Sequence, residues 1–146
     1  MNGRPVTIVM IEDDAGHAVL IEKNIRRAGV ANPIEAFRDG TTGLDYLLGP
    51  DGSGEGNQGP ALLVLLDLNL PDMSGIDILK RVKSNDILKR VPVVILTTTD
   101  DAQEIQRCYD LGCNVYVTKP VNYENFSQAI RQLGLFLSVM QVPETS

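Results

Sequence analysis

Cysteine, histidine, basic charge and long apolar runs are all scarce in this chain of 146 residues. No apolar stretch approaches the roughly eighteen residues that a membrane-spanning helix needs, and the first residues predict a strand rather than a signal peptide. The two cysteines, Cys108 and Cys113, have neither a CxxC spacing nor histidine partners, which argues against a zinc site or a redox motif. We therefore expect a cytoplasmic protein without membrane association, in which both cysteines are small buried hydrophobes.

The charge balance and the single histidine argue against two further classes of function. The chain has 13 basic and 19 acidic residues, a net charge of -6, and no basic stripe that would offset repulsion from a phosphate backbone. Direct binding of nucleic acid is therefore not expected. His17 alone cannot make an internal phosphodonor system, and we interpret it as a residue on a helix surface rather than a ligand or a relay.

The composition is otherwise that of an ordinary globular protein, with 43% hydrophobic and 22% charged residues. Its length predicts a single domain over residues 1–146, with no separate output domain. The segment 49–60, GPDGSGEGNQGP, has too little apolar surface to fold. We interpret it as a flexible insertion between the second helix and the third strand.

Five short apolar segments alternate with five predicted helices, a pattern typical of a parallel sheet with crossover connections. The predicted strands are VTIVMI at 6–11, IEAF at 34–37, LLVLL at 62–66, VVIL at 93–96 and VYV at 115–117. The helices are expected over 15–28, after the turn at 39–40, and over 76–84, 101–112 and 123–139. In the first helix, we expect Leu20, Ile21 and Ile25 to face the core.

Polar side chains follow four of these strands: Glu12 with Asp13, Asp67, Thr97 and Lys119. Ligands bind at the carboxyl ends of the strands in open α/β sheets, so we expect these side chains to converge. Three neighbouring carboxylates repel one another unless they are protonated or bridged by a cation. The sequence therefore predicts a site for a hard divalent cation, Mg²⁺ or Mn²⁺.

The ligand chemistry of Mg²⁺ suggests a role for each oxygen. We expect Asp13 and Asp67 to bind the cation directly, Glu12 through water, and the main-chain carbonyl of Asn69 to complete the protein ligands. An ionised carboxylate is also a nucleophile, so Asp67 could attack a phosphoryl group and become phosphorylated. Lys119 and Thr97 would then supply an ammonium and a hydroxyl to the phosphoryl oxygens.

Four motifs carry a family resemblance. IEDD, LLDLNLPDMSG, VVILTT and YVTKP occur in this order over nearly the whole chain and resemble the receiver domain of two-component response regulators. The resemblance implies an α/β fold, a flavodoxin-like doubly wound five-stranded parallel sheet of order 2-1-3-4-5 with five helices. It also implies that Asp67 accepts its phosphoryl group from a sensor histidine kinase, with Glu12 and Asp13 on Mg²⁺ and Thr97 and Lys119 on the phosphoryl group.

The same resemblance assigns further positions. Tyr116 would be the switching aromatic, and the peptide bond before Pro120 would be cis. Asn69 and Thr99 would set how quickly water removes the phosphoryl group. Thr98 stands where a smaller residue is usual and could narrow access to that group, whereas Glu12 replaces a frequent aspartate.

The insertion and the ending GLFLSVMQVPE resemble single-domain regulators associated with bacterial phytochromes, so the kinase would be a bacteriophytochrome. The final predicted helix also carries a second apolar stripe, formed by Leu135, Val139 and Val142, opposite its core face. We expect a homodimer seam along this stripe and the face made by the fourth helix, the fifth strand and the final helix. A chain end folded back on its own domain is the alternative.

Two other classes of function share part of this chemistry. A haloacid-dehalogenase-like phosphohydrolase also combines an aspartate nucleophile, a hydroxyl, a lysine and acidic metal ligands, but it needs a general acid where Asn69 stands. A pure binding module for nucleotides would need a Gly-rich phosphate loop, and the sequence 14–17 is DAGH instead. We therefore expect no enzyme beyond a receiver that catalyses its own Mg²⁺-dependent phosphorylation and dephosphorylation.

Overall fold

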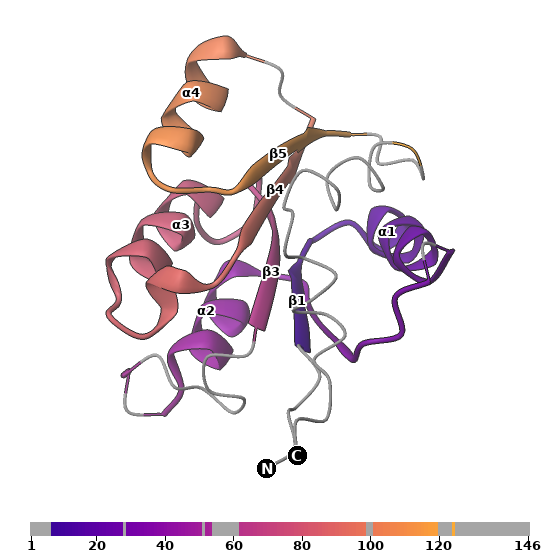
Figure 1. Ribbon diagram of the computed structural model, residues 1–146, viewed down its shortest axis with the longest axis horizontal. Helices are drawn as coiled ribbons and strands as arrows, with labels where there is room; N and C mark the ends of the chain where they lie inside the picture. The colour runs from indigo at the N-terminus through magenta and orange to yellow at the C-terminus, as the bar shows by residue number, and fades with distance from the viewer. Residues whose placement is uncertain are drawn as a thin grey trace, which may run out of the picture.

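A parallel sheet of five strands forms the centre of the molecule in a computed structural model (Figure 1). The structure describes residues 7–27, 29–50, 52–53, 62–98, 101–119 and 124. The strand order is β2-β1-β3-β4-β5, and every pairing is parallel. The strands are β1 (Thr7–Ile11), β2 (Ile34–Phe37), β3 (Leu62–Asp67), β4 (Val93–Thr97) and β5 (Val115–Thr118). The flavodoxin-like fold predicted from the sequence is confirmed.

Helices cover both faces of the sheet (Figure 1). The described helices are α1 (Ala15–Arg27), α2 (Gly40–Leu48), α3 (Gly75–Ser84), α4 (Ala102–Asp110) and a short 3₁₀ turn, Leu88–Arg90. None of these described helices is long and apolar enough to cross a membrane. The expected final helix over 123–139, with its stripe of Leu135, Val139 and Val142, lies outside the described residues, as do Thr99, Pro120 and most of the insertion at 49–60.

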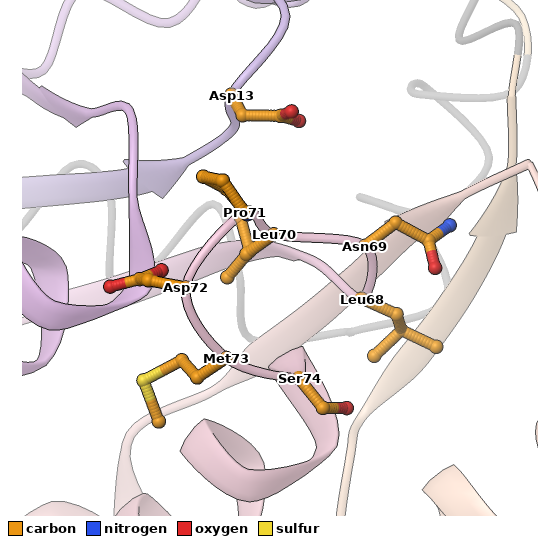
Figure 2. A pocket seen from close by; sticks show the side chains of 8 residues that line it. All are labelled: Asp13, Leu68, Asn69, Leu70, Pro71, Asp72, Met73 and Ser74. Carbon is orange, nitrogen blue, oxygen red and sulfur yellow. The ribbon is translucent and has the colours of Figure 1, made fainter.

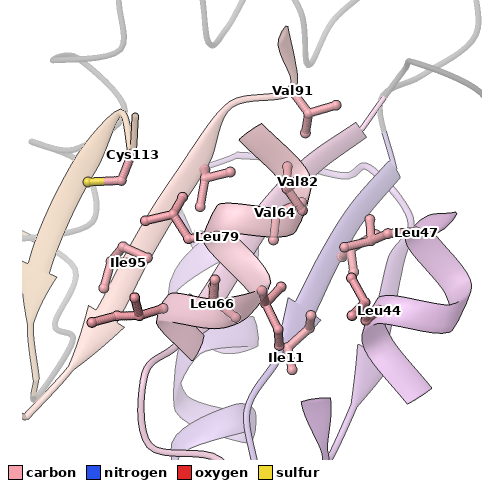
Figure 3. Close-up of a cluster of buried hydrophobic side chains, with 14 of the residues drawn as sticks. Ile11, Leu44, Leu47, Val64, Leu66, Leu79, Val82, Val91, Ile95 and Cys113 are labelled. Carbon is pink, nitrogen blue, oxygen red and sulfur yellow. The ribbon is translucent and has the colours of Figure 1, made fainter. Parts of the chain in front are cut away.

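Alternating strand residues build two separate cores, because successive side chains of a strand point to opposite faces. Ile8 and Met10 of β1 pack with α1, whereas Val9 and Ile11 pack with α2, α3 and Cys108 of α4. Figure 3 shows the second cluster, in which side chains of α2 and α3 meet those of the central strands. All four strand residues are at most 2% exposed. Burial on both faces explains why these strands appear in the sequence as continuous apolar runs.

The ends of α1 match the sequence prediction, but one of its core residues does not. Asp14 accepts a hydrogen bond from the backbone N–H of His17 at 2.9 Å, and Gly29 has a φ of 87° after the helix. Ile21 and Ile25 are buried, whereas Leu20 is 40% exposed, so its predicted inward position is wrong. The buried stripe on α1 runs through Ala18, Ile21 and Ile25. Leu20 precedes Ile21 and is therefore rotated about 100° around the helix axis from this stripe.

Helix α4 lies within the span 101–112 that the sequence predicts. Of its side chains Cys108 is fully buried, Ile105 is partly buried, and Ala102 and Tyr109 are exposed. Both Cys108 and Cys113 are buried free thiols, as predicted.

Candidate phosphoryl-transfer site

The carboxylates of Glu12, Asp13 and Asp67 meet at the carboxyl end of the sheet. Strand β1 pairs with β3 so that Ile11 lies beside Leu66, which makes the next residues of the two strands neighbours. The three side chains each offer an oxygen, and these oxygens all lie within 4.8 Å of one another. Glu12 and Asp67 are buried, whereas Asp13 is exposed. The predicted convergence of acidic residues is therefore present in the structure.

Lys119 enters the same cluster from the end of β5. Its backbone N–H donates to the carbonyl of Thr97 at 2.7 Å, which fixes the start of the side chain beside β4. Its ammonium forms an ion pair with Glu12 Oε1 and lies 3.3 Å from Asp67 Oδ2, with the side chain only 5% exposed. One buried cation therefore contacts two of the three carboxylates, and the remaining negative charge favours binding of a further cation.

Burial raises the pKa of Glu12 above its ordinary value of 4.5, and the neighbouring Asp67 carboxylate acts in the same direction. The hydrogen bond from Lys119 and that from the backbone N–H of Asp14, at 3.1 Å, lower the pKa and oppose this effect. We expected Glu12 to contact the cation through water; in this structure its partner is Lys119.

An open pocket of about 590 Å³ lies beside the acidic cluster (Figure 2). Asp13 lines one side, and residues 68–74, which we call the β3–α3 loop, curve round the other. The acidic cluster beside it offers three carboxylate oxygens, the hard ligands that Mg²⁺ and Mn²⁺ prefer, and Asp13 is exposed to solvent. The residues present therefore fit a divalent cation.

The first residues of the β3–α3 loop are hydrogen-bonded to Asp67 and Thr97. The backbone N–H of Asn69 donates to Asp67 Oδ1 at 3.1 Å, and its side-chain amide donates to the Thr97 hydroxyl at 3.4 Å. Asn69 also forms an isolated antiparallel bridge with Ser74, and the N–H of Gly75 donates to the carbonyl of Leu68 at 2.9 Å. These bonds hold both ends of the loop next to Asp67.

Thr97 is the last residue of β4, and Tyr116 lies on the neighbouring strand β5, opposite Ile95. Thr97 is fully buried, and the next residue, Thr98, is exposed. Tyr116 is partly buried on β5, and its backbone N–H donates to the hydroxyl of Tyr109 on α4 at 3.1 Å. The hydrogen bond between Tyr109 and Tyr116 joins α4 to the edge strand of the sheet.

His17 is on the surface of α1, as predicted from the sequence, and it also lies beside Lys119 and Glu12. Its side chain is 44% exposed, yet Nδ1 lies 3.2 Å from Lys119 Nζ and 3.9 Å from Glu12 Oε2. A usable signal is present in the sequence, because position 17 falls in the first turn of the predicted helix, directly after the acidic pair.

The chain is similar to proteins of known family. The family model of the response regulator receiver domain matches residues 8–131. A solved receiver domain from Rhodospirillum rubrum is 76% identical, with a TM-score of 0.80 over 97% of this chain and 99% of that one. The bacteriophytochrome response regulator RtBRR is 36% identical, with a TM-score of 0.79 over 91% of this chain and 80% of its own.

A relative compared by sequence alone is also a response regulator. Response regulator Rcp1 of Synechocystis is 31% identical over 90% of this chain and 88% of its own length. A solved Mn²⁺-bound form of Rcp1 has a TM-score of 0.74 over 97% of this chain and all of that chain (100%), at 27% identity.

Proposed function

This chain belongs to the response regulator receiver family, whose members are signalling modules, and on that premise we propose that Asp67 accepts a phosphoryl group from a sensor histidine kinase. The observation that carries the proposal is the buried carboxylate of Asp67, which touches the ammonium of Lys119 and faces two further carboxylates. The phosphohydrolase alternative finds no support in the comparisons.

The transfer is a displacement at phosphorus. A carboxylate oxygen of Asp67 forms the new P–O bond while the P–N bond to the kinase histidine breaks, and the imidazole leaves with the electron pair of that bond. Lys119 lies where its ammonium can donate to a phosphoryl oxygen. The hydroxyl of Thr97 can donate to a second phosphoryl oxygen once the Thr97 side chain turns toward Asp67.

We propose that Asp13 and Asp67, Glu12 through water, and the carbonyl of Asn69 hold Mg²⁺ or Mn²⁺. When bound, the cation neutralises charge on the phosphoryl oxygens and the carboxylates. The Mn²⁺-bound form of Rcp1 and the acidic cluster of this chain support the assignment.

The proposed output is a rearrangement that begins at Thr97. In the structure its hydroxyl accepts a hydrogen bond from Asn69, which must yield when Thr97 turns toward a phosphorylated Asp67. The space vacated would admit Tyr116, and its backbone bond to Tyr109 would pass the change to α4. We propose that Thr98 narrows access to the phosphoryl group, while Asn69 and Thr99 tune its hydrolysis.

The proposed partners are a bacteriophytochrome kinase and a second copy of this chain. The likeness to RtBRR supports the first. The second would pair through α4, β5 and the stripe of Leu135, Val139 and Val142. Size-exclusion chromatography before and after phosphorylation tests the pairing: a dimer in either state supports it, and a monomer in both contradicts it.

The decisive experiment exposes the purified chain to acetyl phosphate with and without Mg²⁺ and measures its intact mass. We expect the wild type to gain one phosphoryl group only with the metal, and Asp67→Asn to gain none. Asp86→Asn, which changes an aspartate with a 97% exposed side chain in the same way, serves as the matched control and should behave like the wild type. Phosphorylation of Asp67→Asn to the wild-type extent would refute the assignment.

A further inference from the structure

The carboxylate of Asp72, in the middle of the β3–α3 loop, is bound to the N-terminus of α2. It accepts hydrogen bonds from the backbone N–H of Gly40 at 2.7 Å and of Thr41 at 2.8 Å, and from the hydroxyl of Thr41. Its partners are 31 and 32 residues away along the chain. Figure 2 shows the side chain of Asp72 pointing away from Asn69, out of the loop toward α2.

Helix α2 has a cap without Asp72. Asp39, directly before the helix, accepts from the backbone N–H of Thr42 and from its hydroxyl, both at 2.8 Å. The first N–H groups of a helix need acceptors and favour negative charge, so a second carboxylate is stabilised there. Its hydrogen bonds to Thr41 and Gly40 lower the pKa of Asp72 to about 2, so it is ionised at neutral pH. Because Asp39 already caps α2, the main consequence of the Asp72 hydrogen bonds is that they anchor the β3–α3 loop to the helix.

Packing reinforces this attachment beside Asp72. Gly40 lies so close to Met73 that a Cβ at position 40 would come within 2.8 Å of the Met73 sulfur. The ends of the loop are held at Asp67 by the bonds of Asn69 and Gly75 described above. The loop is therefore fixed at its two ends and, through Asp72 and Met73, at its centre.

We propose that Asp72 is a positioning residue for the cation site: by fastening the β3–α3 loop to α2, it holds the carbonyl of Asn69 in place before a metal arrives. The inference rests on the proposed function, because it assigns Asn69 as a ligand. A loop without this attachment would be ordered only when the cation binds, and the cost of that ordering would weaken binding. Asp72 itself would touch no metal.

The test is a calorimetric titration of the full chain with MgCl₂ for three variants. Asp72→Asn should weaken Mg²⁺ binding about tenfold, the usual scale for residues that support metal ligands. Thr41→Val removes one bond to Asp72 without changing any charge, and it should weaken binding about threefold. Asp39→Asn is the matched control, because it also removes a carboxylate charge from the N-terminus of α2, keeps an oxygen that can cap the helix, and leaves the loop attached. Its Mg²⁺ affinity should stay within about twofold of the wild type.

A second readout separates positioning from chemistry. At saturating Mg²⁺, Asp72→Asn should reach the wild-type rate of phosphorylation by acetyl phosphate, since only the Mg²⁺ concentration required would change. Unaltered Mg²⁺ affinity in Asp72→Asn, or an equal loss in Asp39→Asn, would overturn the role of Asp72 and leave the proposed function standing. Should Asp72→Asn not fold, an unaltered affinity in Thr41→Val would overturn it. A wild-type chain that does not bind Mg²⁺ would refute both.

Discussion

Lys119 Nζ lies 3.2 Å from His17 Nδ1, so the only histidine of the chain touches the lysine of the acidic cluster. An ammonium has three N–H donors, and here three acceptors surround it: Glu12, Asp67 and His17. If Glu12 turns toward a cation, His17 Nδ1 remains beside the ammonium, and in the tautomer whose Nδ1 carries no proton it accepts a hydrogen bond that keeps Lys119 directed at Asp67.

Replacing His17 should therefore slow phosphorylation without abolishing it. We expect His17→Leu to lower the rate with acetyl phosphate at saturating Mg²⁺ about fivefold, the value of one hydrogen bond of about 1 kcal/mol. His17→Gln retains an acceptor and should recover most of the rate. Equal rates for His17→Leu and the wild type, measured by intact mass over time, would show that Lys119 needs no support from α1.

Gly75 has no room for a side chain. A Cβ there would clash with the carbonyl oxygen of Asp67 and come within 2.7 Å of Leu68 Cα, and both obstacles are backbone. We expect Gly75→Ala to lower the free energy of unfolding by about 3 kcal/mol, as measured by urea denaturation. Gly16→Ala on α1 is the control, because the atom nearest its Cβ is a side-chain oxygen of Asp14 at 3.2 Å. A helical alanine there should leave stability unchanged or slightly raised.

The raised pKa of Glu12 makes the site sensitive to mild acid. A carboxylate whose pKa in the fold exceeds 4.5 stabilises the metal-free fold below pH 4.5, and that contribution is lost as the pH rises through the folded-state pKa. Cation binding has the opposite dependence, since it needs ionised Glu12. We expect Mg²⁺ affinity to fall between neutral and mildly acidic pH. In Glu12→Gln the affinity should be weaker and flatter with pH; an equally steep profile would assign the dependence to another group.

The two thiols should be unreactive while the protein is folded. Burial raises the pKa of Cys108 and raises that of Cys113 to about 12, so little of the reactive thiolate is present. At mildly alkaline pH, we expect Ellman's reagent to label the native chain only as fast as it unfolds, and two thiols per chain to react at once in guanidinium chloride. Rapid labelling without denaturant would mean that this part of the core opens readily.

The sequence predicts the centre of the site because parallel strands bring their carboxyl ends to one edge. The apolar runs place Glu12, Asp13, Asp67 and Lys119 at such ends without any knowledge of the structure. The strand pattern does not show how each helix is rotated about its axis, so side-chain contacts that depend on this rotation cannot be predicted from it. Leu20 was placed on the wrong side of α1, and the contact between His17 and Lys119 depends on the same rotation.

The sequence also does not predict hydrogen bonds between residues that are far apart along the chain. Asp72 follows a proline in a loop, where an aspartate usually bonds to its own turn, so local sequence gives no reason to seek partners at Gly40 and Thr41. Only the folded arrangement of α2 beside the β3–α3 loop supplies them.

Tyr109 also bears on the behaviour of this protein at high concentration. Strand β5 ends the described sheet, and an unpaired N–H on such a strand is a template on which a second chain can add and start an aggregate. The N–H of Tyr116 donates to the hydroxyl of Tyr109, so it is not free to bond to an added strand. Tyr109→Phe would therefore remove this acceptor and make the chain more prone to precipitate on storage.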